Sequence, residues 1–502
     1  MLSKFPLYAL SGYNKSYKLF NELFVAGKAM KIIMSEYKTT WREKLCYGIG
    51  ATGLDLSYGM FYSFLSYYLS NTLGLNEAFL LILTPIARIW DGINDPLMGT
   101  IVDNTRTKFG KYRPWIVIGA VCNAVVLFLL FTKFGLEGTP LYIYIGVMYI
   151  LWGMTNTMAD IPYWSMVPSF TSDPKDRNLV STVARTFSGL GQGIITVATP
   201  IILPLLSSGI KDEKGYNGLG FSRWAGICGI LLVVFSVICV LSTKEKNVVY
   251  GKKTKFSFKK IFTVIAHNDQ LVVFMIFAML SNAGWYLTSG TAAYYFGSVL
   301  GDLKKQSLFS TIGAVGSVLG LLVIPVLSKW FSKKKIYQIS LITTIVGYVA
   351  MYITGPVLNI TINGQPLIMD ICYIISSTGI ASMFVSQTIF LADIVDYGEY
   401  KNNERNESIT FSMKGFLQKM AYTIQTIILF GGLAIVDYSD QAKANQGYTE
   451  ATKSAIGFIC FAIPPLLLLL SLIIFSTKFK LYGKLADEVH DYIVNKRAKE
   501  TE

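Results

Sequence analysis

The stretch from Pro464 to Phe475 reads Pro-Pro-Leu-Leu-Leu-Leu-Leu-Ser-Leu-Ile-Ile-Phe and contains no charged residue. Two further runs, from Gly229 to Leu241 and from Pro114 to Phe131, are also uncharged and largely apolar. The hydrocarbon core of a bilayer is about 30 Å thick, and a helix needs about 20 residues to cross it. Each run therefore supplies all or most of one membrane crossing.

The composition of the whole chain indicates the same lipid environment. Of the 502 residues, 52% are hydrophobic and 15% are charged, whereas a soluble globular protein carries about 25% charged residues. Most soluble enzymes are therefore excluded. We predict an all-α polytopic membrane protein with about twelve transmembrane helices. The spans are expected near residues 45–70, 76–102, 114–133, 140–168, 178–207, 221–242, 270–299, 307–328, 335–354, 366–397, 406–436 and 452–477.

The charge balance predicts how the chain is oriented. A formal net charge of +14 could indicate a nucleic-acid partner, but basic residues of polytopic membrane proteins gather in cytoplasmic loops beside anionic lipids. We therefore expect a lipid bilayer and no nucleic acid as partner. The loops expected inside are 106–113, 175–177, 244–260, 329–335 and 401–405, while 71–77, 135–140 and 355–366 hold no Lys or Arg. Both termini should then be cytoplasmic in a multi-pass protein of the cell membrane.

The longest basic connection divides the predicted spans six and six. The expected parts are an N-terminal cytoplasmic segment 1–41, a six-helix bundle 42–243, a central loop 244–265, a second six-helix bundle 266–480 and a cytoplasmic tail 481–502. Two six-helix halves related by an axis along the membrane normal are the plan of the major facilitator fold. Met34 precedes a good polar lead-in to the first span, so translation is hypothesised to start there.

A short internal echo supports two pseudo-symmetric halves. Ala159-Asp160-Ile161 in the fourth predicted span is matched by Ala392-Asp393-Ile394 in the tenth. A basic residue follows within the next span of each half, Arg185 in the first and Lys414 in the second. Such short strings match by chance easily, and the match gains weight because it falls at equivalent spans.

The sequence contains no sign of enzyme chemistry or of a cofactor. Its six cysteines have no Cys-x-x-Cys spacing and lie mostly in apolar segments, and its two histidines are in polar surroundings. These features argue against a disulfide framework, haem or zinc. No Ser/His/Asp set or phosphate-binding loop is evident either. We predict that the protein is not an enzyme and has no cofactor.

Charged residues inside the predicted spans point to the functional interior. Such a residue costs about 2.5–3.5 kcal/mol at mid-span and normally faces a cavity or a partner. The residues are Asp55, Arg88, Asp91, Asp95, Asp160, Arg185, Lys414 and Lys419. Unpaired, the eight would cost on the order of 20 kcal/mol. We therefore expect them to converge on a polar interior.

The second span reads Ala87-Arg88-Ile89-Trp90-Asp91-Gly92-Ile93-Asn94-Asp95-Pro96. Helical spacing places Asp91, Asn94 and Asp95 on one face. Oxygen-rich sets of this kind suit a small hard cation, and Thr157 and Asp160, one turn apart in the fourth span, could complete the set. The alternative is structural ion pairing with Arg88. Because one basic residue cannot neutralise two acids, we favour a cation site.

The fourth span offers a candidate substrate site. Asp160-Ile161-Pro162-Tyr163-Trp164 places a carboxylate and an indole about one turn apart. A sugar presents hydroxyls to a carboxylate and an apolar face to an aromatic ring. Alternatively, Trp164 belongs to the interfacial aromatic belt and Asp160 serves helix packing.

At these residues the chain resembles the glycoside-pentoside-hexuronide:cation symporters, and among them the melibiose permease branch. The resemblance covers roughly residues 42–482. It is carried by Tyr47 to Asp55, Ala87 to Pro96, Gly99 and Asp103 with Gly110 to Trp115, Tyr149 to Pro168, and Ala392 to Lys401.

The resemblance implies roles for individual residues. It assigns the coupling cation, Na⁺ or otherwise H⁺ or Li⁺, to Asp91, Asn94, Asp95 and Thr157, and sugar contacts to Asp55, Asp160, Trp164 and Arg185. Lys419 matches a basic residue near the cation site. Phe384 stands where the family pattern has Trp, which puts galactoside preference in doubt because Phe lacks the indole N–H. Coupling or gating roles are expected for Arg88, Asp103, Arg106, Lys111, Arg113 and Lys419, although solvated positive-inside charge is an alternative for the loop residues.

The expected function is import of a glycoside, oligosaccharide or related sugar, coupled to a monovalent cation. The expected mechanism is alternating access by a functional monomer. The alternative is a transporter of the same fold that carries a lipid or another non-sugar solute.

Overall fold

The computed structural model describes residues 39–170, 174–208, 217–245, 258–403, 407–444 and 447–501. Every regular element within these ranges is a helix, which confirms the predicted all-α fold. Three sequence features fall wholly or mostly outside the described residues: the candidate start at Met34, the segment before residue 39 and the central basic loop.

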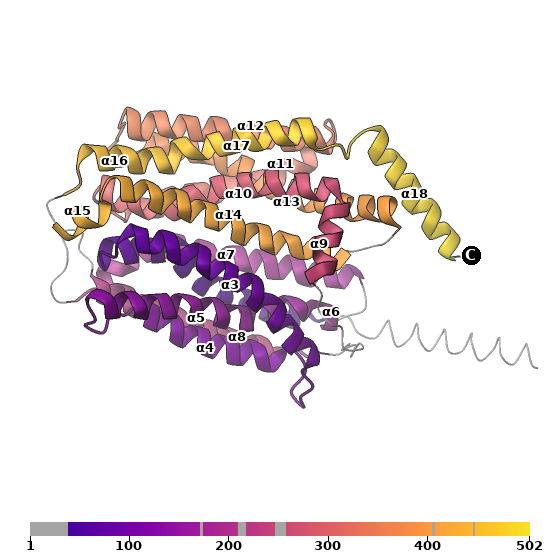
Figure 1. The fold of residues 1–502 in the computed structure, drawn as a ribbon, viewed down its shortest axis with the longest axis horizontal. Coiled ribbons are helices and arrows are strands. Elements are labelled where there is room, and N and C mark those ends of the chain that lie inside the picture. The colour runs from indigo at the N-terminus through magenta and orange to yellow at the C-terminus, as the bar shows by residue number, and fades with distance from the viewer. Residues whose placement is uncertain are drawn as a thin grey trace, which may run out of the picture.

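The first half of the molecule contains six long helices (Figure 1). The first crossing consists of α2 (Trp41–Gly59) and two π-helical turns, η1 (Met60–Leu65) and η2 (Tyr68–Thr72). The other elements are α3 (Glu77–Asn104), α4 (Arg113–Leu130), α5 (Gly138–Ser165), the single turn α6 (Val167–Phe170), α7 (Pro174–Leu206) and α8 (Gly218–Ser242).

The second half repeats this plan after the short helix α9 (Phe258–His267). Its crossings are α10 (Asp269–Tyr294) with η3 (Tyr295–Val299), α11 (Lys305–Leu327), α12 (Lys333–Tyr352) with η4 (Ile353–Val357), α13 (Leu367–Asn402), α14 (Glu407–Ile435), and α16 (Glu450–Gly457) with η5 (Phe458–Ala462) and α17 (Ile463–Lys478). α15 (Tyr438–Ala444) precedes the last crossing and α18 (Lys484–Thr501) follows it.

Polar residues set the start of several spans. Thr40 accepts a hydrogen bond from the Glu43 backbone N–H, and the Glu43 carboxylate accepts one from the Thr40 backbone, which forms a capping box at α2. Asn76 caps α3 and Asn268 caps α10 in a similar way. Such caps satisfy the N–H groups that a helix start leaves without partners. The polar lead-in predicted before the first span therefore has a structural function.

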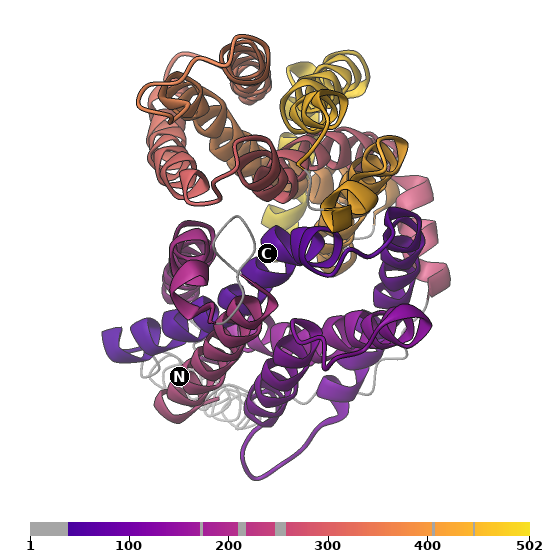
Figure 2. The same cartoon turned by 90° about the vertical axis from the view of Figure 1, so that its left-hand side faces the viewer.

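The two halves pack their helices in the same pattern, viewed along the helices in Figure 2. In each half the first crossing packs against the fifth and sixth, the third against the fourth and sixth, and the second against the fourth. Between the halves, α3 packs against α14 and α7 against α11. This repeated pairing confirms two pseudo-symmetric six-helix bundles of major facilitator type.

Close packing of the third and fourth crossings depends on glycine in both halves. A Cβ atom built on Gly119 of α4 would lie 2.5 Å from the Ala159 nitrogen of α5. One on Gly347 of α12 would lie 2.5 Å from the Ser376 nitrogen of α13. Small residues let helix backbones approach closely inside a bilayer, where packing drives association.

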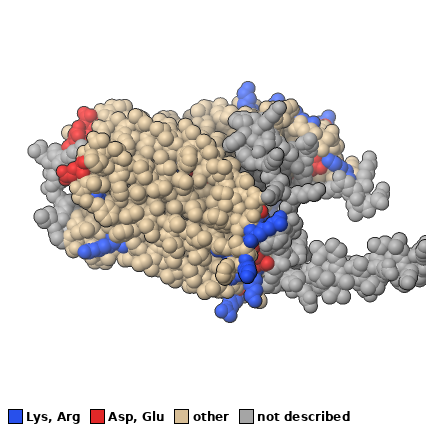
Figure 3. All heavy atoms as spheres, turned by 60° about the horizontal axis from the view of Figure 1, so that its bottom comes forward, with Lys and Arg blue, Asp and Glu red and all other residues tan. Residues whose placement is uncertain are grey.

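The face of the bundle drawn in Figure 3 is largely uncharged between two charged ends. Among the described residues, eight crossings are long and apolar enough to span a membrane. The other four predicted spans, α2, α3, α5 and α14, carry seven of the eight interior charges named above. Their lower apolarity thus reflects the polar interior that they line.

Two ends of the bundle are distinguished by their loops. We call the end that carries residues 105–112, 329–332 and α18 the basic end, and the end that carries residues 73–76, 358–366 and α15 the opposite end (Figure 1). The tail was expected only as a cytoplasmic segment, yet α18 folds against α13. Its residues Val489 and Ile493 are buried there, which explains why a mostly polar segment forms an ordered helix.

Candidate functional site

The two acids of α3 are both paired with basic residues. Arg88 donates from Nη1 to Asp91 Oδ2 at 2.7 Å, and both side chains are almost fully buried. Lys419 of α14 donates to Asp95 and lies 4.0 Å from Asp91 Oδ2. The expectation that a single basic residue faces two acids was therefore wrong, because the second half supplies another. The pairing alternative is realised in this conformation.

The remaining members of the predicted cation site lie beside these acids. Thr157 of α5 donates from Oγ1 to Asp95 Oδ1 at 2.9 Å. Asn94 Nδ2 is buried and has no hydrogen-bond partner among the described residues. Two carboxylates, an amide and a hydroxyl thus lie together, and their oxygens are the ligand type that hard cations prefer. This donor set fits a small monovalent cation when Lys419 moves away from Asp95.

Three residues that the sequence reasoning missed shape this group. A Cβ atom on Gly153 of α5 would lie 2.8 Å from Asp91 Oδ1, so the absence of a side chain at Gly153 leaves room for the carboxylate. Tyr62 accepts a hydrogen bond from Arg88 Nη1 at 3.0 Å, and the Tyr422 ring lies 5.4 Å from the Arg88 guanidinium. None follows a local motif, because each lies on another helix from Asp91.

The predicted sugar contacts of the first half come together on α5 and α7. The Trp164 indole N–H donates to Asp160 Oδ1 at 2.9 Å. The Arg185 guanidinium lies over the Trp164 ring, 3.7 Å from its centroid. Asp55 of α2 faces α7, where a Cβ atom built on Gly191 would lie 3.0 Å from the Asp55 Cβ. Asp160, Trp164 and Arg185 therefore form one group, and Asp55 lies on a helix that packs against α7.

Phe384 lies on α13 in the second half, whereas the group around Asp160 and Trp164 belongs to the first half. Its ring packs edge-on against Trp285 of α10, with centroids 5.2 Å apart. Trp285 therefore places an indole beside the position where the family pattern has one. The sequence alone gives little indication that Trp285 belongs to the site, because a single Trp in an apolar helix is common.

The predicted gating residues tie one loop of the basic end to its own half. Lys111 donates to Asp103 at 2.7 Å, and Glu245 accepts from the backbone N–H groups of Lys111, Tyr112 and Arg113. Arg113 also donates to the Val240 carbonyl at 2.6 Å. Arg106 lies in the same loop. Lys111 is nearly buried, so it is not a solvated positive-inside charge as the alternative supposed.

The pKa of Lys111 is consistent with this pairing. Burial lowers it, but the hydrogen bond from Lys111 to Asp103 and the neighbouring Tyr112 outweigh burial, and the pKa is raised above its usual value. The lysine therefore stays charged, and the loop is held as an ion pair rather than as a neutral contact.

The halves contact each other at the opposite end. Tyr438 and Tyr448 both donate to Asn71 Oδ1, at 3.0 and 2.6 Å. Tyr294 donates to Ser70 Oγ at 3.1 Å. At the basic end, by contrast, the pairs Lys44–Asp176, Lys401–Asp269, Lys333–Asp393 and Lys496–Glu399 each join residues of one half. The opposite end is closed in this conformation.

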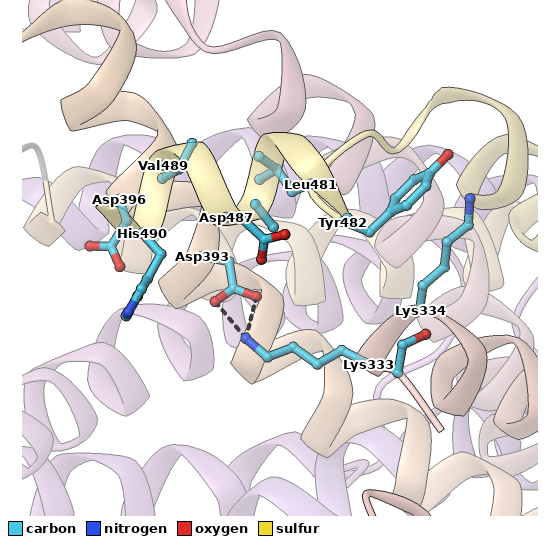
Figure 4. A pocket seen from close by; sticks show the side chains of 12 residues that line it. Lys333, Lys334, Asp393, Asp396, Leu481, Tyr482, Asp487, Val489 and His490 are labelled. Atoms are coloured by element: carbon cyan, nitrogen blue, oxygen red, sulfur yellow. Dashed lines mark hydrogen bonds and ion pairs between the residues drawn. The ribbon is translucent and has the colours of Figure 1, made fainter. Parts of the chain in front are cut away.

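A cavity of about 390 Å³ lies at the basic end of the second half (Figure 4). It is lined by the start of α12, by α13 and by α18, and Lys333 reaches both Asp393 carboxylate oxygens there at 2.9 Å. None of the predicted site residues lines it. Asp393, the echo of Asp160, is thus part of an ion pair outside the interior group.

The two packed helix bundles and the uncharged flank are those of a multi-pass membrane protein of the major facilitator type. The chain belongs to the MFS/sugar transport protein family, whose model matches residues 46–482, and is therefore a transporter and not an enzyme.

Curated relatives share much of the chain. A lactose permease of Leuconostoc lactis is 29% identical over 470 residues, which cover 89% of this chain and 71% of the relative. A raffinose carrier protein of Pediococcus pentosaceus is 26% identical, covering 92% of this chain and 72% of the relative. A putative glycoside/cation symporter of Escherichia coli (strain K12) is 24% identical, with 92% and 97% covered.

Solved structures agree on the fold. The nucleoside transporter NupG superposes with a TM-score of 0.61 at 14% identity and covers 87% of this chain and 100% of its own. A bacterial homologue of the human lysosomal transporter Spinster gives a TM-score of 0.60 at 13% identity, with 87% and 96% covered.

Proposed function

We propose that the protein is a cation-coupled sugar symporter that imports a glycoside, an oligosaccharide or a related sugar by alternating access. The observation that carries the proposal is the position of Asp95, which accepts from Thr157 of the first half and from Lys419 of the second. A cation that replaces Lys419 there changes a contact between the two halves. Relatives described as lactose permease and raffinose carrier support a sugar as the solute.

The coupling step follows from the charges. With the cation absent, Lys419 neutralises Asp95 and Arg88 neutralises Asp91. A cation bound by Asp91, Asn94, Asp95 and Thr157 takes over the charge of Lys419 and releases α14 from α3. Because α5 carries both Thr157 and Asp160, cation binding at Thr157 also positions Asp160 and its neighbours to bind the sugar.

The sugar binds to the group on α5 and α7. Asp55 and Asp160 accept hydrogen bonds from hydroxyls, Trp164 offers an aromatic edge or face, and Phe384 closes the site from the second half. Sugar and cation cross together as the halves rock about the site. One elementary charge moved through about 100 mV supplies about 2.3 kcal/mol, or roughly fifty-fold accumulation at about 1.4 kcal/mol per factor of ten.

The basic end is assigned to the cytoplasm because Lys and Arg favour that side. The described conformation, closed at the opposite end, is then the one that faces inward. The protein is assigned to the cell membrane with both termini inside, and it works as a monomer. Na⁺ fits the Asp, Asn, Asp and Thr set, while H⁺ on Asp95 is the competing possibility.

The experiment is uptake into proteoliposomes of labelled oligosaccharides, glycosides and uronides, under an imposed gradient of Na⁺ or of H⁺. Accumulation driven by one gradient identifies the coupling ion. No sugar uptake under either gradient, with binding of a lipid or another solute, would replace the proposal by the alternative.

A further inference from the structure

Tyr62 lies where three crossings of the interior meet. Its hydroxyl accepts a hydrogen bond from Arg88 Nη1 of α3 at 3.0 Å. Its ring stacks on Tyr58 of α2, with centroids 4.1 Å apart, and meets the Tyr422 ring of α14 edge-on at 4.3 Å. This one side chain therefore contacts the first crossing, the helix that carries the acids of the proposed cation site, and a helix of the second half.

The stack of Tyr58 and Tyr62 depends on the π-helical turn η1. Tyr58 belongs to the last turn of α2, and Tyr62 belongs to η1, which begins at Met60. A π-helical turn is wider than an α-helical turn, so side chains four residues apart lie nearly in line along the helix. The two rings consequently face each other at an interplanar angle of 29°. Such turns inside helices frequently occur at functional sites.

Arg88 connects Tyr62 to the first acid of α3. The nitrogen that donates to the Tyr62 hydroxyl, Nη1, also donates to Asp91 Oδ2 at 2.7 Å, and Arg88 is buried. A cation bound to Asp91 would compete with the guanidinium for this carboxylate, because like charges repel strongly where water does not screen them. Any ion at Asp91 would thus act on the group that holds the Tyr62 hydroxyl.

Tyr422 connects Tyr62 to the second acid of α3. It lies three residues after Lys419 on α14, so the two side chains are neighbours on one face of that helix. Lys419 donates to Asp95. The rings of Tyr62 and Tyr422 are both buried, and closely packed side chains transmit displacements to each other. Movement of Lys419 away from Asp95 would therefore displace the ring that packs on Tyr62.

Tyr58 connects Tyr62 to the proposed sugar site. Tyr58 follows Asp55 by three residues on α2, so these side chains are also neighbours on one helix face. Tyr58 and Asp55 are partly exposed, whereas Tyr62 is buried behind them. The position of Tyr62 is thus linked, through one ring contact, to the turn of α2 that carries Asp55.

We propose that Tyr62 is the positioning residue that couples the proposed cation site to the proposed sugar site. The proposal rests on the proposed function and adds to it the residue that links the two sites. A cation at the acids of α3 competes with Arg88 for Asp91, which acts on the Tyr62 hydroxyl. It also displaces Lys419, and the movement of α14 acts on the Tyr62 ring. Tyr62 then shifts the turn of α2 that carries the sugar contact.

The test is the effect of the cation on sugar affinity, measured by calorimetry on the purified full-length protein. The sugars are lactose, raffinose and the 4-nitrophenyl α- and β-galactosides, glucosides and glucuronides. Each is titrated in neutral choline chloride, in neutral sodium chloride and in choline chloride at lower pH. The coupling ratio is the dissociation constant in neutral choline chloride divided by that in the sodium or the acidic buffer. For wild type it should be about ten or more for at least one sugar, a usual size for coupled sites.

Two variants remove the two contacts of Tyr62 separately. Tyr62→Phe keeps both ring contacts and removes the hydroxyl that Arg88 holds. Its coupling ratio should fall roughly tenfold, because a hydrogen bond to a charged group accounts for a factor of about that size. Tyr422→Leu removes the ring that α14 places against Tyr62, and its ratio should also fall. Effects on sugar affinity that are common to the buffers cancel in the ratio, so a purely structural role of Tyr62 would not change it.

The control is Tyr68→Phe, which removes a hydroxyl from another buried ring of the same crossing. Tyr68 lies in η2 near the opposite end, where its ring packs on Phe131 and Phe221. Its replacement should leave the coupling ratio within about a factor of two of wild type. A wild-type ratio in Tyr62→Phe or in Tyr422→Leu, or an equal fall in Tyr68→Phe, would overturn the inference and leave a sugar symporter.

The wild-type titrations test the proposed function separately. Absence of binding by every sugar in every buffer would overturn the sugar as substrate, and the inference with it. Binding with a coupling ratio of about one for every sugar would overturn the cation coupling, and again the inference with it. Both results come from wild type alone, so they are distinct from a failure that only the variants reveal.

Discussion

Glu77, at the start of α3, accepts two hydrogen bonds from Ser439 of α15. The Ser439 backbone N–H lies 2.6 Å from Glu77 Oε1 and its hydroxyl 2.8 Å from Oε2. The carboxylate thus binds to the N-terminus of a helix in the other half, where the helix dipole favours negative charge. Since both residues are buried, this contact helps to close the opposite end.

Glu77→Gln should open that end more often. The amide keeps one acceptor but loses the charge, and a hydrogen bond to a charged group contributes about 1.5–3 kcal/mol. The population open at this end should rise roughly tenfold or more. The measurement is the rate at which a membrane-impermeant maleimide labels Cys introduced as Ser70→Cys, a buried position at the contact between the halves.

The control for this prediction is Glu137→Gln, which removes an exposed acid at the same end. Both substitutions are made in the Ser70→Cys background, so its own effect cancels. Equal labelling rates in the two double variants would show that the Glu77 contact does not hold the end closed.

The sequence predicted the local part of this architecture and of the site. The crossings follow from apolar length, and the shared face of Asp91, Asn94 and Asp95 follows from helical spacing, because both depend on residues close in the chain. The pair Lys419–Asp95 joins residues 324 positions apart, and Glu77–Ser439 joins residues 362 apart. Such pairs depend on how α3 packs against the second half, which no local pattern contains.

The expectation that Asp91 and Asp95 have too few basic partners was wrong for the same reason. Arg88 is the basic residue within one turn, but Lys419 comes from another helix. Gly153 was missed because its role is to leave space for Asp91, and the sequence does not show which glycine of another helix lies beside that carboxylate. The resemblance to a symporter family did point to Lys419 as a basic residue near these acids, which form the proposed cation site, because a family pattern holds information about distant contacts.

Asp95→Cys should abolish gradient-driven sugar uptake while the protein still reaches the membrane. Its carboxylate accepts from both Thr157 and Lys419, so its loss removes a ligand of the proposed cation site and the charge that Lys419 neutralises. Uptake into cells and sugar counterflow in vesicles are compared with those of Asp302→Cys, an exposed loop acid. Unchanged accumulation in Asp95→Cys would rule out the proposed cation site.

Gly153→Ala should weaken the coupling of sugar uptake to the cation, because it displaces the Asp91 carboxylate. The added Cβ would lie 2.8 Å from Asp91 Oδ1, so the carboxylate must shift. We expect the cation concentration for half-maximal uptake to rise roughly tenfold, as for loss of one interaction of about 1.4 kcal/mol. Gly193→Ala on α7 is the matched control, since nothing lies within 4 Å of its added Cβ. The same shift in both variants would indicate a general packing effect.

Asp176→Asn should destabilise the first half in a way that depends on pH. Asp176 lies before the membrane-spanning part of α7 and pairs with Lys44 at 2.7 Å, and Thr39 donates to it from its backbone and hydroxyl. Burial raises the pKa of Asp176, but these partners outweigh it and the pKa is lowered. A lowered pKa means that the stabilisation is complete above the unfolded value of about 3.9 and is lost as the pH falls through the folded value.

The measurement is the thermal unfolding midpoint in detergent from neutral to acidic pH. Wild type should exceed Asp176→Asn by a difference corresponding to about 1.5–3 kcal/mol near neutral pH, and the two curves should converge below about pH 4. A difference that stays constant at acidic pH would mean that packing, not charge, is responsible.

Asp160→Asn should reduce sugar affinity, and its echo in the second half provides the control. Asp160 lies beside Trp164 and Arg185 in the interior, whereas Asp393 occupies the matching span but pairs with Lys333 at the basic end. A carboxylate that accepts from a sugar hydroxyl contributes about 1.5–3 kcal/mol, so the dissociation constant measured by calorimetry should rise roughly tenfold or more in Asp160→Asn. Asp393→Asn should leave it within about a factor of two. Wild-type sugar affinity in Asp160→Asn would show that Asp160 does not contact the sugar. Equal losses of affinity in both variants would also exclude Asp160 from the sugar site, since removing a negative charge would then lower the affinity wherever in the protein it lies.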